Sequence, residues 1–130
     1  MKKLYEIAKE NIKNAYVPYS HFRVSAVLEL KNGETIRGIN VENASFGLSN
    51  CAERSALFAA YSQGIRKEDI KSILVYTDKE YFVSPCGACR QVMKELMEPQ
   101  AKVYFANSKG EIKELLNEEL LPYGFSQEDL

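Results

Sequence analysis

Three cysteines and their spacing constrain this chain more than any other feature of its sequence. Cys51 is followed two positions later by Glu53, while Cys86 and Cys89 form a C-x-x-C that directly follows Pro85. Thiolates are common zinc ligands, and a structural zinc usually takes four protein ligands, whereas a catalytic zinc takes three and a water. Because the chain has only three cysteines, the pattern predicts a catalytic zinc site with one position left for water.

Length and charge restrict the class of protein further. A chain of 130 residues is long enough for one domain with a real core and too short for two ordinary ones. Seventeen basic and eighteen acidic residues give a net charge of −1 without a basic stripe, which argues against a partner that is nucleic acid or membrane. No apolar run approaches the roughly 20 residues of a membrane span, and acidic residues follow Met1 too closely for a signal peptide.

The cysteine count also bears on the cellular compartment. An odd number of cysteines, two of them in a C-x-x-C, suits metal binding in a reducing compartment better than a disulfide framework. We therefore expect a cytoplasmic protein. The C-x-x-C alone would also fit a thioredoxin-like redox pair, but that reading leaves Cys51 unexplained.

Hydrophobic periodicity predicts alternating helices and strands. Helical spacing marks residues 4–15 and an apolar helix at 52–63 that should be buried on most sides, and Ser84 and Pro85 should cap and open a third helix reaching residue 97. Strands are expected at 22–30, 35–41, 70–76, 102–106 and 111–115. The first two and the last two are separated by Asn/Gly-containing turns, which predict hairpins. We expect a single domain over 1–130, a three-layer α/β/α sandwich with a five-stranded mixed sheet.

Charged residues beside the cysteines suggest how such a site would work. Three thiolates leave a zinc site net negative, which weakens the ability of the metal to acidify water. Arg54 and Arg90 each follow a candidate site residue, and we favour Arg54 as the guanidinium that hydrogen-bonds a ligating sulfur. Glu53, at the start of the same helix, is predicted to be the general acid/base that acts on the zinc water.

Two alternative roles keep other interpretations open. Glu53 also fits the third position of a capping box with Asn50 as the N-cap, a role that it cannot easily share with proton transfer. His21 as a fourth ligand would give a closed Cys₃His structural zinc, and the chain would then be a binding module rather than an enzyme. Because His21 directly precedes a strand, we expect it instead to be a surface or loop imidazole.

The C-x-E followed by P-C-x-x-C is the signature of zinc deaminases. Other segments extend the match, and together they resemble the small, homotetrameric cytidine deaminases over almost the whole chain and in the same order. These segments are residues 15–24, 38–45, 51–54, 84–91 and 120–122.

This resemblance implies a reaction and residues that perform it. Cys51, Cys86 and Cys89 match the ligands of one Zn²⁺ per subunit. Glu53 matches the proton shuttle that also engages the pyrimidine N3, and Arg54 matches a residue that neutralises cysteine sulfur. The implied reaction of this hydrolase is deamination of cytidine and 2′-deoxycytidine to uridine and 2′-deoxyuridine with release of ammonia, a step of pyrimidine salvage.

The resemblance also assigns substrate contacts. Phe22 matches an aromatic residue that packs on the base, and Asn40 and Glu42 match a pair that hydrogen-bonds the ribose 3′-hydroxyl. The Ala52 main-chain N–H and the Ser84 carbonyl match contacts to the pyrimidine O2 and the exocyclic amine.

Two features concern the assembly implied by the resemblance, a homotetramer with sites shared between subunits. Phe125 matches an aromatic residue that reaches into a neighbouring subunit's site. The chain departs from the family at Ser25 and Val27, where the motif Val-Gly-Ala-Ala is common, and at Phe46, where Tyr is frequent. These departures bear on packing and affinity rather than on the reaction.

Other substrates within the same chemistry are also conceivable. The cytosine-bearing antibiotic blasticidin S is the nearest rival, although Asn40 and Glu42 favour a ribose. A polynucleotide substrate fits less well, because the charge is nearly balanced and an aromatic tail should close the site against a long strand.

Overall fold

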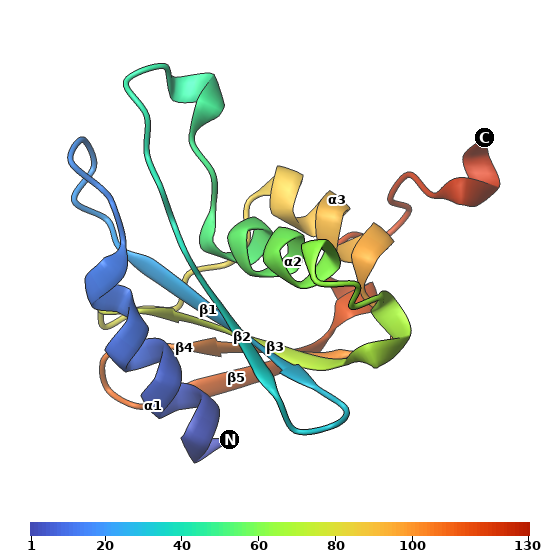
Figure 1. The fold of residues 1–130 in the computed structure, drawn as a ribbon, viewed down its shortest axis with the longest axis horizontal. Coiled ribbons are helices and arrows are strands. Elements are labelled where there is room, and N and C mark those ends of the chain that lie inside the picture. The colour runs from blue at the N-terminus through green and yellow to red at the C-terminus, as the bar shows by residue number, and fades with distance from the viewer.

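The computed structural model describes residues 1–130 and contains one five-stranded sheet with helices on both faces (Figure 1). The strands are β1 (Val24–Leu30), β2 (Thr35–Ile39), β3 (Ile70–Thr77), β4 (Lys102–Ala106) and β5 (Ile112–Leu116). The α-helices are α1 (Lys2–Asn11), α2 (Ala52–Ser62) and α3 (Gly87–Leu96). Short 3-10 helices occupy Ile12–Asn14, Phe46–Leu48, Lys67–Asp69, Asn117–Glu119 and Gln127–Asp129.

The sheet is mixed and has the strand order β2-β1-β3-β4-β5. β1 pairs antiparallel with both β2 and β3, and β4 pairs antiparallel with β5. β3 and β4 are parallel, so the chain must cross over between them, and α3 forms this crossover. The predicted hairpins, the mixed sheet and the α/β fold are therefore confirmed.

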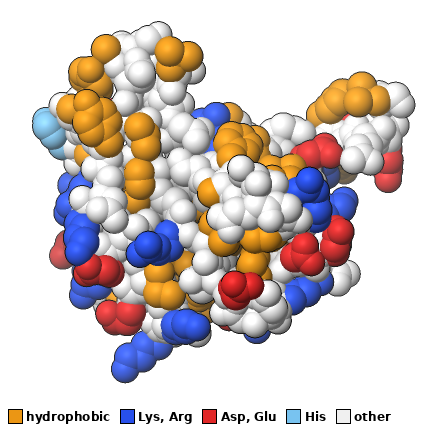
Figure 2. Space-filling view, viewed as in Figure 1, with side chains coloured by type: hydrophobic (Ala, Val, Ile, Leu, Met, Phe, Trp, Pro, Cys, Tyr) orange, Lys and Arg blue, Asp and Glu red, His pale blue; other side chains and the backbone are white.

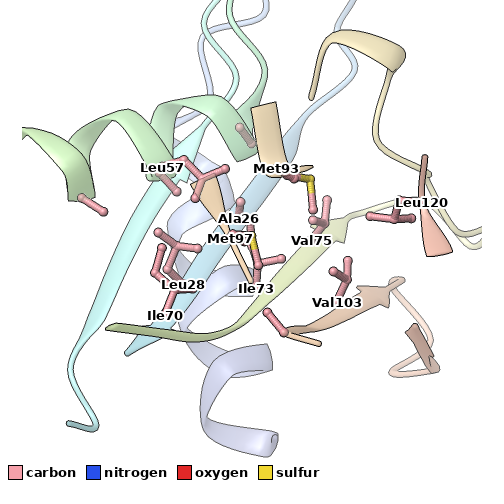
Figure 3. Close-up of a cluster of buried hydrophobic side chains, with 14 of the residues drawn as sticks. Ala26, Leu28, Leu57, Ile70, Ile73, Val75, Met93, Met97, Val103 and Leu120 are labelled. Atoms are coloured by element: carbon pink, nitrogen blue, oxygen red, sulfur yellow. The ribbon is translucent and has the colours of Figure 1, made fainter. Parts of the chain in front are cut away.

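Alternation along β1 divides the core into two parts. Ala26 and Leu28 point toward α2 and α3, where they pack with Leu57 and Met93 in the larger cluster (Figure 3). Val27 points to the opposite face. Because successive side chains of a strand alternate between faces, one short strand contributes to both helix layers.

Helix α1 covers the other face of the sheet. Leu4, Ala8 and Ile12 recur at helical spacing, and all three are buried against residues of β1 and β3, including Leu74 and Tyr76. The predicted amphipathic helix is confirmed, although its regular part ends at residue 11 and a 3-10 turn follows.

Two details of the helices differ from the sequence-based expectation. Pro85 does not open α3, because Cys86 is the N-cap and its Sγ accepts a hydrogen bond from the Cys89 N–H. A thiol thus occupies the position where the sequence suggested Ser84. Helix α2 is less enclosed than predicted, since Phe58 on its outer side is 47% exposed.

Residues 42–49 form an arm that projects beyond the sheet (Figure 1). Its base is closed by an antiparallel bridge in which Val41 and Asn50 exchange two main-chain hydrogen bonds of 2.9 Å. Cys51 follows this bridge directly, so the start of α2 is set by the base of the arm. None of the helices combines the length and the apolar character that crossing a membrane requires.

Candidate metal centre and active site

The N-terminus of α2 is held against the sheet by a glycine. A Cβ placed on Gly38 of β2 would lie 2.5 Å from both the Ala52 oxygen and the Ala56 nitrogen. Only a residue without a side chain allows the helix to approach so closely. This contact fixes the height at which the first turn of α2 sits above the sheet.

Three sulfur atoms meet where α2 and α3 begin. Cys51 is the N-cap of α2 and Cys86 the N-cap of α3, while Cys89 lies in the first turn of α3. All three Sγ atoms lie within 4.8 Å of one another, and the Cys51 and Cys86 sulfurs are 3.7 Å apart. Three convergent thiols at helix N-termini, where the partial positive charge favours thiolate, suit Zn²⁺ with one position left open.

The thiols differ in their affinity for a proton. A hydrogen bond from Cys89 is the main factor that lowers the pKa of Cys51, to about 5, and Arg54 acts in the same direction. The hydrogen bond to Cys51, together with burial, raises the pKa of Cys89. The lowered pKa of Cys51 favours its thiolate form, which is the form of cysteine that binds a metal.

Glu53 is buried beside these sulfurs. Its side chain is only 4% exposed, and it does not form the capping box that was an alternative, because the N-cap is Cys51 and has no side-chain cap. The Asn50 amide instead donates to the Ser55 hydroxyl at 3.2 Å. Burial raises the pKa of Glu53 to about 7, and the Cys51 charge adds to this shift. A carboxyl with such a pKa can both hold and release a proton near neutral pH.

The two arginines have distinct surroundings. Arg54 Nη2 donates to Cys51 Sγ at 3.5 Å, the sulfur contact that charge compensation requires. Arg90 contacts no sulfur, and its Nε donates to the Pro85 carbonyl at 2.8 Å and its Nη1 to the Leu120 carbonyl at 2.7 Å. Arg90 thus holds the loop that leads into α3 in place. The position of Arg90 next to Cys89 in the sequence did not indicate this role.

His21 does not join the cysteine cluster. The group of side chains able to share a metal comprises only the three cysteines, and His21 lies exposed in the loop before β1. The closed Cys₃His site is therefore not formed.

The side chains expected to bind ribose follow β2 and hydrogen-bond the chain that leads into β1. Asn40 hydrogen-bonds main-chain atoms of Phe22 and Val24, and the Glu42 carboxylate accepts hydrogen bonds from Tyr19 and Ser20. The structure therefore brings Phe22, Asn40 and Glu42 together through this loop.

Phe22 has a stacking partner that the sequence did not reveal. Its ring lies 6.5 Å from that of Tyr81, with an interplanar angle of 25°. Tyr81 lies between β3 and α3, in a segment without a family motif. A cluster of aromatic residues at 81–82 was the only signal that pointed to it.

The remaining predicted residues flank α3. The Ser84 hydroxyl accepts a hydrogen bond from Arg90, and Phe125 is tied to α3 by a 2.9 Å hydrogen bond from the Gln91 amide to its carbonyl. The Phe125 ring remains 56% exposed. Phe125 is therefore anchored by its main chain while its side chain stays free.

The residues that depart from the family pattern lie in contrasting environments. Ser25 and Val27 are fully buried, and the Ser25 hydroxyl has no hydrogen-bond partner. Phe46 is 91% exposed at the tip of the arm. The first two alter the core, and the third alters a surface.

This fold and site define a class of protein. A three-layer α/β/α domain that places three thiols and a buried carboxylate at the starts of two helices is the architecture of a zinc-dependent deaminase.

Comparisons with known proteins identify the family. Residues 1–106 match the model of the cytidine and deoxycytidylate deaminase zinc-binding region. A cytidine deaminase of Halalkalibacterium halodurans is 55% identical over 118 residues, which cover 91% of this chain and 88% of that protein. A cytidine deaminase of Sporosarcina psychrophila is 45% identical over 130 residues, which cover 100% of this chain and 94% of that protein. The crystal structure of cytidine deaminase from Burkholderia pseudomallei superposes with a TM-score of 0.91 at 44% identity, covering 95% of this chain and 98% of that one.

The chain therefore belongs to the cytidine and deoxycytidylate deaminase family and is an enzyme of the cytidine deaminase type. The resemblance inferred from the sequence motifs is confirmed.

Proposed function

We propose that this enzyme deaminates both cytidine and 2′-deoxycytidine, to uridine and 2′-deoxyuridine, and serves pyrimidine salvage. The observation that carries the proposal is the buried Glu53 carboxyl beside three convergent thiols. Residues 1–130 act as a single catalytic domain. A position for metal-activated water and an adjacent proton carrier are the two requirements for replacing an amino group by water.

Cys51, Cys86 and Cys89 would hold one Zn²⁺ per subunit. When bound, the zinc supplies a water molecule that is acidic enough to act as a nucleophile near neutral pH. Arg54 offsets part of the thiolate charge through its hydrogen bond to Cys51.

Glu53 moves the protons. It takes one from the attacking water and delivers it to the pyrimidine N3, which makes C4 more electrophilic. It then takes the second proton from the hydroxyl now bonded to C4 and passes it to the exocyclic nitrogen, so that the C4–N bond breaks and ammonia leaves as C4 regains its double bond to oxygen. A pKa of about 7 suits both transfers, because neither protonation state is strongly preferred near neutral pH.

Other side chains and main-chain groups orient the nucleoside. Ala52 is the first residue of α2, so its N–H has no partner within the helix and can donate to the pyrimidine O2. The Ser84 carbonyl accepts from the exocyclic amine, and Phe22 packs on the base. Asn40 and Glu42 bind the ribose 3′-hydroxyl.

We further propose a homotetramer in the cytoplasm, with Phe125 completing a neighbouring subunit's site. Hydrophobic side chains gather on the projecting arm and on the C-terminal tail (Figure 2). Among them Phe46 and Leu48 are 91% and 72% exposed. The three free thiols suit a reducing compartment. Light scattering coupled to size-exclusion chromatography measures the assembly, and a monomer that deaminates fully would contradict the shared site.

The test of the catalytic assignment replaces Glu53 by Gln, which keeps the size and removes the proton carrier. Zinc content, measured by atomic emission, should be unchanged. Ultraviolet monitoring of cytidine and 2′-deoxycytidine should show turnover lowered by roughly 10³-fold or more. Near-normal turnover in Glu53→Gln would refute the shuttle, and a wild-type preference for blasticidin S would refute the nucleoside assignment.

A further inference from the structure

The Ser20 hydroxyl links two of the residues expected to touch substrate. It donates to Glu42 Oε2 and accepts a 3.0 Å hydrogen bond from the Phe22 N–H. The main-chain N–H groups of Tyr19 and Ser20 donate to Glu42 Oε1 at 3.0 and 3.1 Å. One hydroxyl therefore connects the carboxylate of Glu42 to the backbone that carries the Phe22 ring.

Asn40 holds the other side of Phe22. Its Nδ2 donates to the Phe22 carbonyl at 2.8 Å, and its Oδ1 accepts from the Val24 N–H at 3.0 Å. β1 begins at Val24 and β2 ends at Ile39, so no strand ladder holds this stretch. Side chains therefore fix the Phe22 backbone at both its N–H and its carbonyl.

The backbone between these contacts is in an unfavourable conformation. His21 has a φ of +58°, in the left-handed region that non-glycine residues adopt at a cost of about 1 kcal/mol. The Ser20–Phe22 hydrogen bond spans this residue and closes a turn of the type that serine side chains form. The serine hydroxyl therefore helps to hold this turn, together with the main-chain hydrogen bond of 3.0 Å from the His21 N–H to the Val17 carbonyl.

The hydrogen bonds leave one donor and one acceptor unused. A carboxylate offers about four acceptor positions, and Tyr19 and Ser20 occupy two on Oε1 of Glu42 and one on Oε2. Asn40 Nδ2 has a second N–H beyond the one given to Phe22. A sugar hydroxyl, which is both donor and acceptor, complements this remaining pair.

We propose that Ser20 is a positioning residue of the substrate site, which holds Glu42 and Phe22 in one arrangement and thereby couples recognition of the ribose 3′-hydroxyl to packing on the base. The proposal rests on the proposed function of Asn40, Glu42 and Phe22. When side chains are already ordered in the free enzyme, substrate binding does not incur the entropy cost of ordering them, so the affinity for substrate is higher.

The test compares two nucleosides, cytidine and 3′-deoxycytidine, which lacks the hydroxyl in question. Ser20→Ala should lower kcat/KM for cytidine by roughly ten-fold, mainly through KM, because it removes a charge-assisted hydrogen bond that orders the site. The same variant should lower the ratio of kcat/KM for cytidine to kcat/KM for 3′-deoxycytidine, since a displaced Glu42 no longer forms a hydrogen bond with the 3′-hydroxyl.

Two further variants serve as controls. Ser20→Thr keeps the hydroxyl and should retain most of the preference. Ser62→Ala removes an exposed serine at the far end of α2 and should leave both kinetic constants unchanged. Circular dichroism and Tm report whether each variant is folded.

Failure of the Ser20 proposal can be distinguished from failure of the proposed ribose contact. If Ser20→Ala keeps the wild-type preference while its Tm falls, Ser20 only stabilises the loop, and the positioning role is overturned. If the wild-type enzyme does not prefer cytidine over 3′-deoxycytidine, the ribose contact itself fails, and with it this part of the proposed function.

Discussion

Gly38 offers the sharpest test of how the fold sets the active site. A Cβ at this position would lie 2.5 Å from the Ala52 oxygen and the Ala56 nitrogen and 2.9 Å from the Ala56 Cβ. Ordinary van der Waals contact begins at 3.4 Å, so in Gly38→Ala the helix must retreat by about 0.9 Å. Two of the three clashing atoms belong to the backbone, and no side-chain rotation can relieve them.

This displacement should lower both stability and activity. Overpacking against a rigid neighbour costs typically 1–3 kcal/mol, and the backbone contacts place Gly38→Ala near the upper end. For 130 residues, about 3 kcal/mol corresponds to a fall in Tm of about 11 °C. Helix α2 begins directly after Cys51 and carries Glu53, and a shift of about 1 Å in reacting groups costs roughly 100-fold in rate.

Calorimetry and the cytidine assay, at equal protein and zinc concentrations, measure the two effects. Ser62→Ala is the control, because Ser62 lies exposed at the far end of the same helix and outside every proposed contact. This variant should behave as the wild type. If Gly38→Ala equals Ser62→Ala in both Tm and turnover, the close approach does not position α2 and the packing argument is wrong.

Four further predictions concern buried polar groups, charge and metal. Ser25→Ala removes a buried hydroxyl without a partner and should stabilise the protein by about 1 kcal/mol, seen as a higher urea midpoint at constant m. Arg54→Gln should keep zinc but lower kcat by roughly 10–100-fold, because the thiolate charge loses its partner. Removal of zinc by a chelator should abolish turnover. If free zinc was present at 1,000 times its Kd before chelation, the free energy of unfolding should fall by about 4 kcal/mol, and added zinc should restore both turnover and stability. Burial raises the pKa of Tyr76 to about 12 from its ordinary 10. The resulting contribution to stability is fully present below pH 10 and is lost as pH rises toward 12. The Tm of Tyr76→Phe should therefore fall less than the Tm of the wild type between pH 10 and pH 12.

The sequence predicted most of the fold because its signals were local. The strand character of residues 22–30 and 35–41, the Asn-Gly turn between them and the helical spacing of Leu4 and Ala8 are each contained in a short stretch of sequence. The start of α3 was misjudged for the same reason. Ser84-Pro85 is a favourable local opening, but the structure caps the helix with Cys86, whose sulfur is held by the tertiary cluster.

Only those parts of the candidate site could be predicted whose chemistry follows from residue type and spacing in the sequence. C-x-E and C-x-x-C predict three metal ligands and a proton carrier without any knowledge of the fold. The stacking of Tyr81 on Phe22 and the bracing of Leu120 by Arg90 join residues 59 and 30 positions apart. Such contacts depend on strand order and loop path, which no local pattern contains.

The bridge that closes the arm at Val41 and Asn50 has an evolutionary consequence. Because the two hydrogen bonds isolate the arm from the start of α2, insertions or deletions between residues 43 and 48 need not move Cys51. The length of this segment can therefore diverge among descendants of one ancestor while catalysis is preserved. Lineages can remodel the exposed surface of the arm without rebuilding the site that follows it.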